Sequence, residues 1–273
     1  MILKTIQNKT EQVIRIAFVN TYTRLNNSVL LVEYPKSGGT WLGQLISSYL
    51  EIPFPRNRIP GLKKSLYHSH YLPNNRLLKN KKIVFLVRDG RDVMVSLYHH
   101  WLLWNEKNKL NPKDVNYHRS KVPFDDFENV RVNMGSFIKY VFENKPSKIK
   151  HFTYMGNWYV YNKNWMEKMK THDNIYLLKY EDLLEKPYET MESLFKDFFK
   201  VKIDTNKLND IINEFSFENQ AQRKKGVENR NSFLRKGIRG DWKNYFGPSE
   251  NELFKKYTKD LLVELNYEVN RSL

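Results

Sequence analysis

The chain has 273 residues, and its 46 Lys and Arg against 30 Asp and Glu give a formal net charge of +16. Such a surplus favours an anionic partner, whether a nucleotide, a nucleic acid, an acidic glycan or an anionic membrane, although a lysine-rich solvated surface gives the same composition. Cysteine is absent, which excludes disulfides, thiolate zinc sites and cysteine nucleophiles, and no apolar run approaches the ~20 residues that a membrane span requires.

The first segment, residues 1–27, is expected to form a helical extension, because Ile6, Val13 and Phe18 can share one face of a helix. Polar residues interrupt Met1 to Thr10, so the segment lacks the apolar core of a signal peptide. No change of composition divides the remainder. We therefore expect residues 1–273 to form a single domain of a cytoplasmic protein.

The first predicted strand, Val29 to Val32, runs into a loop that contains Gly38 and Gly39. The run is apolar and β-branched, as is typical of a central parallel strand. Glycines lack a Cβ, so backbone N–H groups can curl around an anion at the start of the helix predicted over 41–50. The stretch therefore predicts an anion site, although a turn that needs glycine only for tight packing would have the same pattern.

This loop does not match the Walker pattern G-x-x-x-x-G-K-[ST]. Lys36 precedes the glycines, and no Lys-Ser or Lys-Thr pair follows Gly39. An ordinary ATP or GTP loop is therefore disfavoured. Lys36 nevertheless supplies a mobile positive charge at this point, and Thr40 supplies a hydroxyl.

Strand and helix patterns alternate along the rest of the chain, which is typical of a parallel sheet with helices on both faces. This predicts an α/β fold with three layers. Prolines and glycine end regular structure over 51–65, and residues 105–130 lack periodicity, so we expect a mobile loop there. The predicted strands and helices are a short strand over 65–70, a strand over 81–87, a helix over 93–104, a helix over 156–170, a strand over 174–180, and a helix from 181 towards 199.

A second site candidate begins directly after the predicted strand over 81–87. Arg88 stands at its carboxyl end, where ligands of open α/β sheets lie, and Ser96 follows in the next helix. An arginine fork together with a hydroxyl suits a phosphate monoester. The alternative is a structural ion pair between Arg88 and Asp89 or Asp92.

A third candidate is the basic segment Arg235-Lys236-Gly237, which is followed by Asp241 and Trp242. Paired cations before a glycine form a charged loop whose backbone can approach a phosphate closely. A basic surface loop would have the same composition.

Together, the three stretches resemble the cytosolic-type sulfotransferases, which use 3′-phosphoadenosine 5′-phosphosulfate (PAPS). Tyr34 to Trp41 resembles the family's Y-P-K-S-G-T-T-W loop for the 5′-phosphosulfate, with Gly39 where Thr is common. The Arg88 segment is similar to the element that binds the 3′-phosphate, and the Arg235 segment resembles R-K-G-x-x-G-D-W-K. The resemblance implies a single α/β domain with a central parallel sheet and P-loop nucleotide-kinase-like architecture.

The resemblance also implies which residues bind the donor. Tyr180-Glu181-Asp182 looks like the family's Y-E-D motif, whose Tyr lies near the adenine, and Phe217 and Trp41 resemble the aromatic residues on its two faces. No metal is implied, and adenosine 3′,5′-bisphosphate (PAP) is the product. The donor-binding candidates are Lys36, Ser37, Gly38, Gly39, Thr40, Trp41, Arg88, Ser96, Tyr180, Ser216, Phe217, Arg235, Lys236 and Gly237.

The resemblance implies a catalytic histidine, because the family carries one in the motif K-T-H-x-P. A histidine titrates near working pH and so suits the removal of a proton from the acceptor. His70 matches this histidine, but His68 stands where the family has Lys, and Pro73 is displaced by one residue. His68 is a rival base, and His99 and His100 are weaker ones. Lys36 and Ser96 complete the catalytic candidates: Lys36 for the developing charge and Ser96 as its restraint.

Two other functions fit parts of the sequence. A nucleotide kinase shares the fold class, but the Walker lysine placement and an evident magnesium aspartate are missing. A nucleic-acid-binding module is suggested by the charge and the aromatic residues, although the basic residues are scattered through the chain. We expect no nucleic-acid partner.

The acceptor is not determined by these motifs. Residues 51–80, 105–155 and 220–232 are expected to line its pocket, which could take a glycan, a natural-product alcohol, a phenol or an amine. Gly247 and Pro248 stand at the Thr-Val positions of the family's dimer motif K-x-x-x-T-V-x-x-x-E, so a monomer or a different dimer is expected.

Overall fold

The computed structural model describes residues 27–56, 63–73, 78, 81–106, 108–110, 112–143 and 155–269. The helical extension predicted over 1–27 falls outside these residues, except for Asn27. The described chain divides into two compact units: unit 1 within Met1–Val87 and Asn164–Phe215, and unit 2 within Arg88–Lys163 and Ser216–Leu273. Each unit is described by itself.

Unit 1 contains a sheet of four parallel strands in the order β2-β1-β3-β4. Val29 of β1 lies opposite Leu66 of β2 and Lys82 of β3. β1 is buried along its whole length, because both faces of a central parallel strand are covered, and this explains its continuous apolar run. The structure confirms the four strands predicted from the sequence. They are β1 (Val29–Glu33), β2 (Leu66–Ser69), β3 (Lys82–Val87) and β4 (Ile175–Lys179).

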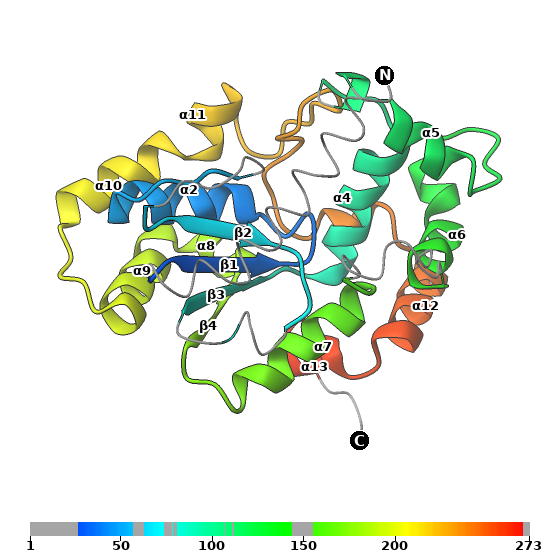
Figure 1. Cartoon of the computed structure of the whole chain (residues 1–273). Helices are drawn as coiled ribbons and strands as arrows, with labels where there is room; N and C mark the ends of the chain where they lie inside the picture. The colour runs from blue at the N-terminus through cyan, green and yellow to red at the C-terminus, as the bar shows by residue number, and fades with distance from the viewer. Residues whose placement is uncertain are drawn as a thin grey trace, which may run out of the picture. The chain divides into compact units, whose positions relative to one another are not determined.

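Helices cover the sheet of unit 1 (Figure 1). On one face, Leu31 and Val84 join Leu45 of the first helix in a common apolar core. On the other face, Trp165 stacks on Phe85 with ring centroids 6.0 Å apart. The helices of this unit are α2 (Gly39–Leu50), α8 (Tyr180–Glu185), α9 (Pro187–Ser193), the π-helix η4 (Leu194–Phe199) and α10 (Thr205–Glu214).

The single helix predicted from 181 towards 199 is wrong, because α8 ends before Pro187. Proline lacks an N–H and cannot continue a helix, but it is well placed at the first position of the next one. Lys186 takes a non-helical conformation between the two helices, with φ −132° and ψ 63°, and α9 begins at Pro187.

Unit 2 is helical. Within it, α4 contacts α5 and α6, and α6 contacts α12. Gly247, in the divergent dimer motif, caps α12, and its N–H donates to Glu250 Oε2 at 2.8 Å. Its elements are α4 (Gly90–Leu102), η2 (Asn108–Leu110), α5 (Lys113–Arg119), α6 (Val130–Glu143), the first half of α7 (Trp158–Met169), α11 (Phe217–Ala221), η5 (Asp241–Asn244), α12 (Pro248–Thr258) and α13 (Leu261–Glu264).

The segment 105–130 was expected to be a mobile loop. It contains regular structure, namely η2 and α5, and its mobility stays a prediction. It is also anchored to α4: Arg119 Nε donates to the Leu102 carbonyl at 2.7 Å, and the Tyr98 hydroxyl donates to the Phe127 carbonyl at 2.9 Å. A helix as short as α5 has too few apolar residues to reveal a period in the sequence.

The order of the strands marks one edge of the sheet for ligand binding. From β1 the chain crosses to β2 on one side, whereas β3 lies on the other side. Such a reversal opens a crevice at the carboxyl ends of the strands. Glu33, the last residue of β1, pairs with Leu86 there. The glycine loop predicted to bind an anion follows Glu33 directly, so the fold places it at this edge. The predicted α/β class with a parallel sheet flanked by helices is confirmed.

Candidate functional site

The glycine loop connects β1 to α2 by a turn in which two residues take the left-handed conformation. Lys36 has a φ of 75° and Gly38 a φ of 107°, and α2 begins at Gly39. The Ser37 N–H donates to the Tyr34 carbonyl at 3.2 Å, and the Gly38 carbonyl accepts the N–H of Trp41 at 3.0 Å. The predicted strand, loop and helix are therefore present, with the positive end of α2 at the loop.

Tyr180 lies directly beside this loop. A Cβ built on Gly38 would stand 2.6 Å from Cδ2 of Tyr180, so no larger residue fits there even apart from the backbone conformation. Trp41 meets Tyr180 edge to face, with ring centroids 5.9 Å apart. The indole Nε1 of Trp41 is buried and has no hydrogen-bond partner among the described residues. A ligand that brings an acceptor atom to this point would satisfy it.

Two histidines at the end of β2, His68 within the strand and His70 directly after it, converge on Glu33. His68 Nε2 lies 2.9 Å from Glu33 Oε1, and His70 Nδ1 lies 2.9 Å from the Glu33 carbonyl oxygen. The two rings contact each other edge to face, with centroids 4.6 Å apart. A carbonyl only accepts, so Nδ1 of His70 carries the hydrogen and the lone pair of the neutral ring is on Nε2. His70 thus has the tautomer that a general base needs.

Glu33 is the residue that the sequence analysis missed. Glu33 is only 4% exposed, and its Oε2 accepts the N–H of Gly39 at 2.5 Å. Burial alone would raise the pKa of Glu33, but the hydrogen bond from His68, the charges of His68 and His70 and the Gly39 N–H together lower it. The signal in the sequence was a lone carboxylate ending a buried apolar run, where a charge must have partners.

The hydrogen bond from the Gly39 N–H to Glu33 affects the anion-binding role predicted for Gly39. We predicted that its backbone N–H contributes to an anion site. In this structure that N–H donates to Glu33, so the amide that meets an anion must be another one of the loop. Thr40, the next residue, accepts a hydrogen bond from Arg56 Nη2 at 3.3 Å through its hydroxyl.

Among the described residues, one group has the donor set of a metal site. One ligand atom each from Glu33, His68 and His70 lie within 4.8 Å of one another. Two imidazoles and a carboxylate suit Zn²⁺. Both carboxylate oxygens of Glu33 are already hydrogen-bonded, to His68 and to Gly39, so a metal would have to displace at least one of these bonds.

In unit 2, Arg88 and Asp92 stand at the start of α4. Arg88 Nη2 is 4.0 Å from Asp92 Oδ2, which agrees with the structural ion pair considered above. Asp92 also accepts the N–H groups of Gly240 at 2.7 Å and Trp242 at 2.9 Å. Asp92 therefore ties the start of α4 to the basic segment, and Arg88 is brought to the same carboxylate. Ser96 is half-buried in α4.

Carboxylates also hold the cations of the basic segment. Arg235 pairs with Asp241 and, at 2.5 Å, with Glu228, while Lys236 Nζ lies 2.6 Å from Asp241 Oδ1. Burial alone would lower the pKa of Arg235, but Asp241 and Glu228 raise it on balance. The guanidinium is thus charged and fixed in place before any ligand arrives.

The ring of Phe217 packs directly against the backbone of Gly237 in unit 2. Gly237 has a φ of 66°, and a Cβ on it would lie 2.3 Å from Cδ2 of Phe217. The close approach of backbone to ring explains why glycine follows the two cations. Ser216 caps the following helix, because its Oγ accepts the Asn219 N–H at 3.3 Å.

His99, a weaker candidate base, is buried within α4 and 7% exposed. Burial, together with the positive charges of Arg235 and Arg230, lowers the pKa of His99 to about 3. Neither ring nitrogen has a hydrogen-bond partner among the described residues. His99 is thus neutral at pH 7 but enclosed, whereas His68 and His70 are both partly exposed.

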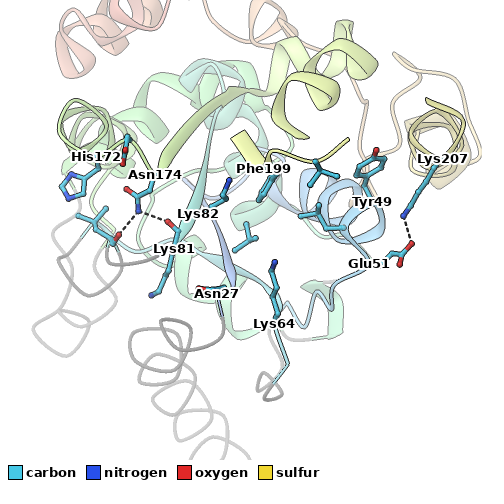
Figure 2. A pocket seen from close by; sticks show the side chains of 15 residues that line it. Asn27, Tyr49, Glu51, Lys64, Lys81, Lys82, His172, Asn174, Phe199 and Lys207 are labelled. Carbon is cyan, nitrogen blue, oxygen red and sulfur yellow. Dashed lines mark hydrogen bonds and ion pairs between the residues drawn. The ribbon is translucent and has the colours of Figure 1, made fainter. Parts of the chain in front are cut away.

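A cavity of about 960 Å³ in unit 1 opens at the other edge of the sheet, near the amino ends of the strands (Figure 2). Lys64, Lys82 and Asn27 line it, and Lys207 is paired with Glu51 at 2.6 Å on its rim. None of the predicted donor-binding residues belongs to its lining.

Within the described chain, no helix combines the length and apolar character needed to cross a membrane.

Comparison with known proteins agrees with these motifs. The sulfotransferase domain family matches residues 26–266. Sulfotransferase 1B1 of Canis lupus familiaris is 26% identical over 84% of this chain and 81% of its own, and Sulfotransferase 1 family member D1 of Mus musculus is 26% identical over 89% and 86%. The solved structure of mouse sulfotransferase SULT7A1 complexed with PAP has a TM-score of 0.62 at 19% identity, covering 94% of both chains. Retinol dehydratase in complex with androsterone and inactive cofactor PAP has a TM-score of 0.59 at 19% identity, covering 95% of this chain and 86% of its own. These structures share the fold, and the family match spans most of the sequence. The chain belongs to the sulfotransferase domain family.

Proposed function

We propose that this protein transfers the sulfuryl group of PAPS to a hydroxyl or amino group of a small-molecule or carbohydrate acceptor. The main support is one arrangement in unit 1: a glycine loop at the carboxyl end of β1, with the imidazoles of His68 and His70 held against the same strand end by Glu33. Two solved structures that share this fold, those of mouse sulfotransferase SULT7A1 and retinol dehydratase, are complexes with PAP. PAPS supplies the sulfuryl group and a stable bisphosphate leaving group.

The residues of unit 1 suit the 5′ end and the base of such a nucleotide. Lys36 and the hydroxyl of Thr40 stand in the loop, where charge and hydrogen bonds would meet the phosphosulfate. Trp41 offers a buried Nε1–H that has no partner among the described residues, and Tyr180 packs against it. A purine ring with acceptor nitrogens fits this pair.

The residues of unit 2 suit the 3′-phosphate. Arg235 and Lys236 are aimed by the shared partner Asp241, and Gly237 lets the backbone approach closely. A phosphate would gain a charge-assisted fork from Arg235 without having to order the side chain first. By resemblance, Arg88 and Ser96 bind the same group, and Phe217 contacts the adenine.

In this proposal His70 is the general base. Its Nδ1 is committed to the Glu33 carbonyl, so Nε2 takes the proton of the acceptor as the new oxygen–sulfur bond forms. Lys36 and the loop amides stabilise negative charge on the departing oxygen. The reaction then needs no covalent enzyme intermediate, because proton removal and charge stabilisation suffice for a direct displacement.

The test is a transfer assay with radiolabelled PAPS and a panel of phenols, alcohols, amines and oligosaccharides. Removing the base in His70→Gln should reduce turnover by roughly 10²- to 10⁴-fold. The matched control is His172→Gln, because His172 is also a half-buried histidine of unit 1 but is hydrogen-bonded to residues 168 and 171, away from the glycine loop. Undiminished turnover in His70→Gln would reject His70 as base, and the absence of transfer to every acceptor would reject the function.

A further inference from the structure

We propose that Glu33 is a positioning residue that joins the glycine loop and the two histidines into one rigid group, and that position 39 is glycine because the Glu33 carboxylate occupies the space of a side chain. The catalytic part of this inference rests on the proposed function, whereas the packing part does not.

The geometry places three donors on this one residue. Oε2 accepts the Gly39 N–H at 2.5 Å, Oε1 accepts from His68 Nε2 at 2.9 Å, and the main-chain carbonyl accepts from His70 Nδ1 at 2.9 Å. The donors come from the start of α2 and from the end of β2, two segments about 30 residues apart in sequence. Hydrogen bonds to a carboxylate are about twice as strong as neutral ones, so Glu33 holds both segments firmly.

Burial makes these bonds obligatory. Glu33 is 4% exposed, and a buried charge without partners is strongly destabilising. Its two donors together with the positive end of α2 meet that demand. The ionised carboxylate only accepts, so Nε2 of His68 must carry the hydrogen. Glu33 thereby fixes the tautomers of both imidazoles.

Gly39 has no conformational reason to be glycine. Its φ is not among the positive values of the chain, and it opens a helix, where Gly is less favourable than Ala. A Cβ there would lie 2.5 Å from the carboxylate carbon of Glu33 and 2.8 Å from Nε2 of His68. The departures from the family pattern at 39 and 68 therefore belong together, because a Cβ at position 39 would meet the His68 ring as well as the Glu33 carboxylate.

The packing test is a double-mutant cycle measured by urea unfolding, which needs no substrate. Gly39→Ala in the wild-type background should reduce the folding equilibrium constant at least tenfold, because the new methyl group meets the carboxylate and the imidazole. In the Glu33→Ala background the same substitution should be neutral or stabilising. The carboxylate is gone, the His68 ring has lost its acceptor and can move away from the new methyl group, and Ala favours the helix. Additive effects of the two substitutions would overturn the inference.

The catalytic test compares Glu33→Gln with wild type over the pH range. An amide has one acceptor oxygen and one donor nitrogen, so it can hold Gly39 and His68 together only if Nε2 of His68 gives up its hydrogen and the imidazole changes tautomer. We expect kcat to fall by about 10- to 100-fold, as for loss of an orienting group. The acid limb of the kcat profile should move to lower pH, because a negative charge beside the imidazoles is lost. An unchanged profile would overturn the positioning role. If wild type transfers no sulfuryl group at all, the proposed function fails, while the unfolding cycle still decides the packing.

The alternative occupant of this cluster is a metal ion. Calorimetric titration of the protein with ZnCl₂ distinguishes the positioning role of Glu33 from a metal site. The positioning role predicts no stoichiometric, tight Zn²⁺ binding by wild type, because both carboxylate oxygens are engaged. One Zn²⁺ per chain, lost in Glu33→Gln and His68→Gln, would overturn it in favour of a metal site.

Discussion

At the scale of single residues, buried carboxylates arrange the cations of unit 2. Asp241 accepts hydrogen bonds from Arg235, Lys236 and Asn244, and Asp92 holds the backbone on either side of Asp241 through Gly240 and Trp242. The motif in the sequence indicated which cations would bind a phosphate. It did not indicate that each cation would first be oriented by a carboxylate.

Two glycines of the basic segment allow a matched comparison. Gly237 and Gly240 both have positive φ, of 66° and 72°, so alanine at either position strains the backbone by about 1–2 kcal/mol. A Cβ on Gly237 would press into Phe217, whereas a Cβ on Gly240 has nothing within 4 Å. We expect Gly237→Ala to weaken PAP binding at least tenfold, measured by calorimetry, through displacement of Phe217. Gly240→Ala is the control, and an equal loss in both variants would contradict the role of Phe217.

His99 should make stability depend on pH. The pKa of His99 is about 3 in the folded state against an ordinary value of 6.5, mainly through burial. The unfolded chain therefore binds a proton that the folded chain does not, between those two values. Stability from this group is complete above pH 6.5 and falls by about 1.4 kcal/mol per pH unit as the pH drops towards 3.

Urea unfolding of wild type and His99→Phe at pH 7, 6, 5 and 4 checks this expectation. Phenylalanine keeps the ring contact with Tyr245, whose centroid lies 6.0 Å away, but cannot be protonated. The difference in unfolding free energy between wild type and variant should shift in favour of the variant as the pH falls. A constant difference would show that His99 is protonated in the folded state.

At the scale of elements, the start of α4 depends on a glycine that packs against aromatic rings. A Cβ on Gly90 would lie 2.7 Å from Cζ of Phe254 and 2.7 Å from Cδ2 of Trp158, and both rings are fully buried. Neither ring can move without disturbing α7 or α12. The first turn of α4, which carries Asp92, is thus set by packing at one position.

Gly90→Ala should therefore destabilise the protein by about 1–3 kcal/mol, as overpacking of a core does. The control is Gly135→Ala in α6, where the nearest atom to a new Cβ is Oε1 of Glu250 at 3.3 Å, a side-chain atom that has to shift by only a few tenths of an ångström. There, alanine should stabilise by about 0.5–1 kcal/mol through helix propensity. Thermal and urea unfolding give both values, and equal effects of the two substitutions would refute the packing argument.

The strands were predictable because β1 and β3 are buried on both faces and so leave short apolar runs in the sequence. The helices of unit 2 were less predictable. The apolar residues Val130, Met134, Phe137 and Val141 of α6 have helical spacing that could have been used. By contrast, α5 buries only Val115, so its helical state depends on tertiary contacts.

At the scale of the whole molecule, the net charge of +16 favours anionic ligands without selecting among them. The motifs select a nucleotide that has phosphate groups at both ends. A ligand that binds only the folded protein stabilises it by mass action, by about 2.7 kcal/mol when its concentration is a hundred times its Kd. At a hundred times its Kd, PAP should therefore raise the free energy of unfolding by about 2.7 kcal/mol, as measured by urea unfolding.

ADP at the same concentration should give a smaller effect, because it has no 3′-phosphate for Arg235 and Lys236. Equal stabilisation by ADP would favour the kinase interpretation over sulfuryl transfer. Binding of DNA in place of PAP, with a steep dependence on salt, would favour the nucleic-acid interpretation.

The sequence by itself determined the parallel sheet, the glycine loop after its first strand, the basic segment and the family, because each is a pattern of neighbouring residues. Only the tertiary structure decided how Glu33, Gly39 and His68 depend on one another, and which carboxylates aim Arg235 and Lys236. These relations join residues from different segments, and their spacing in the chain has no fixed period. The Glu33 carboxylate occupies the space where a Cβ at position 39 would lie, and this can be recognised only once the backbone positions of both residues are known.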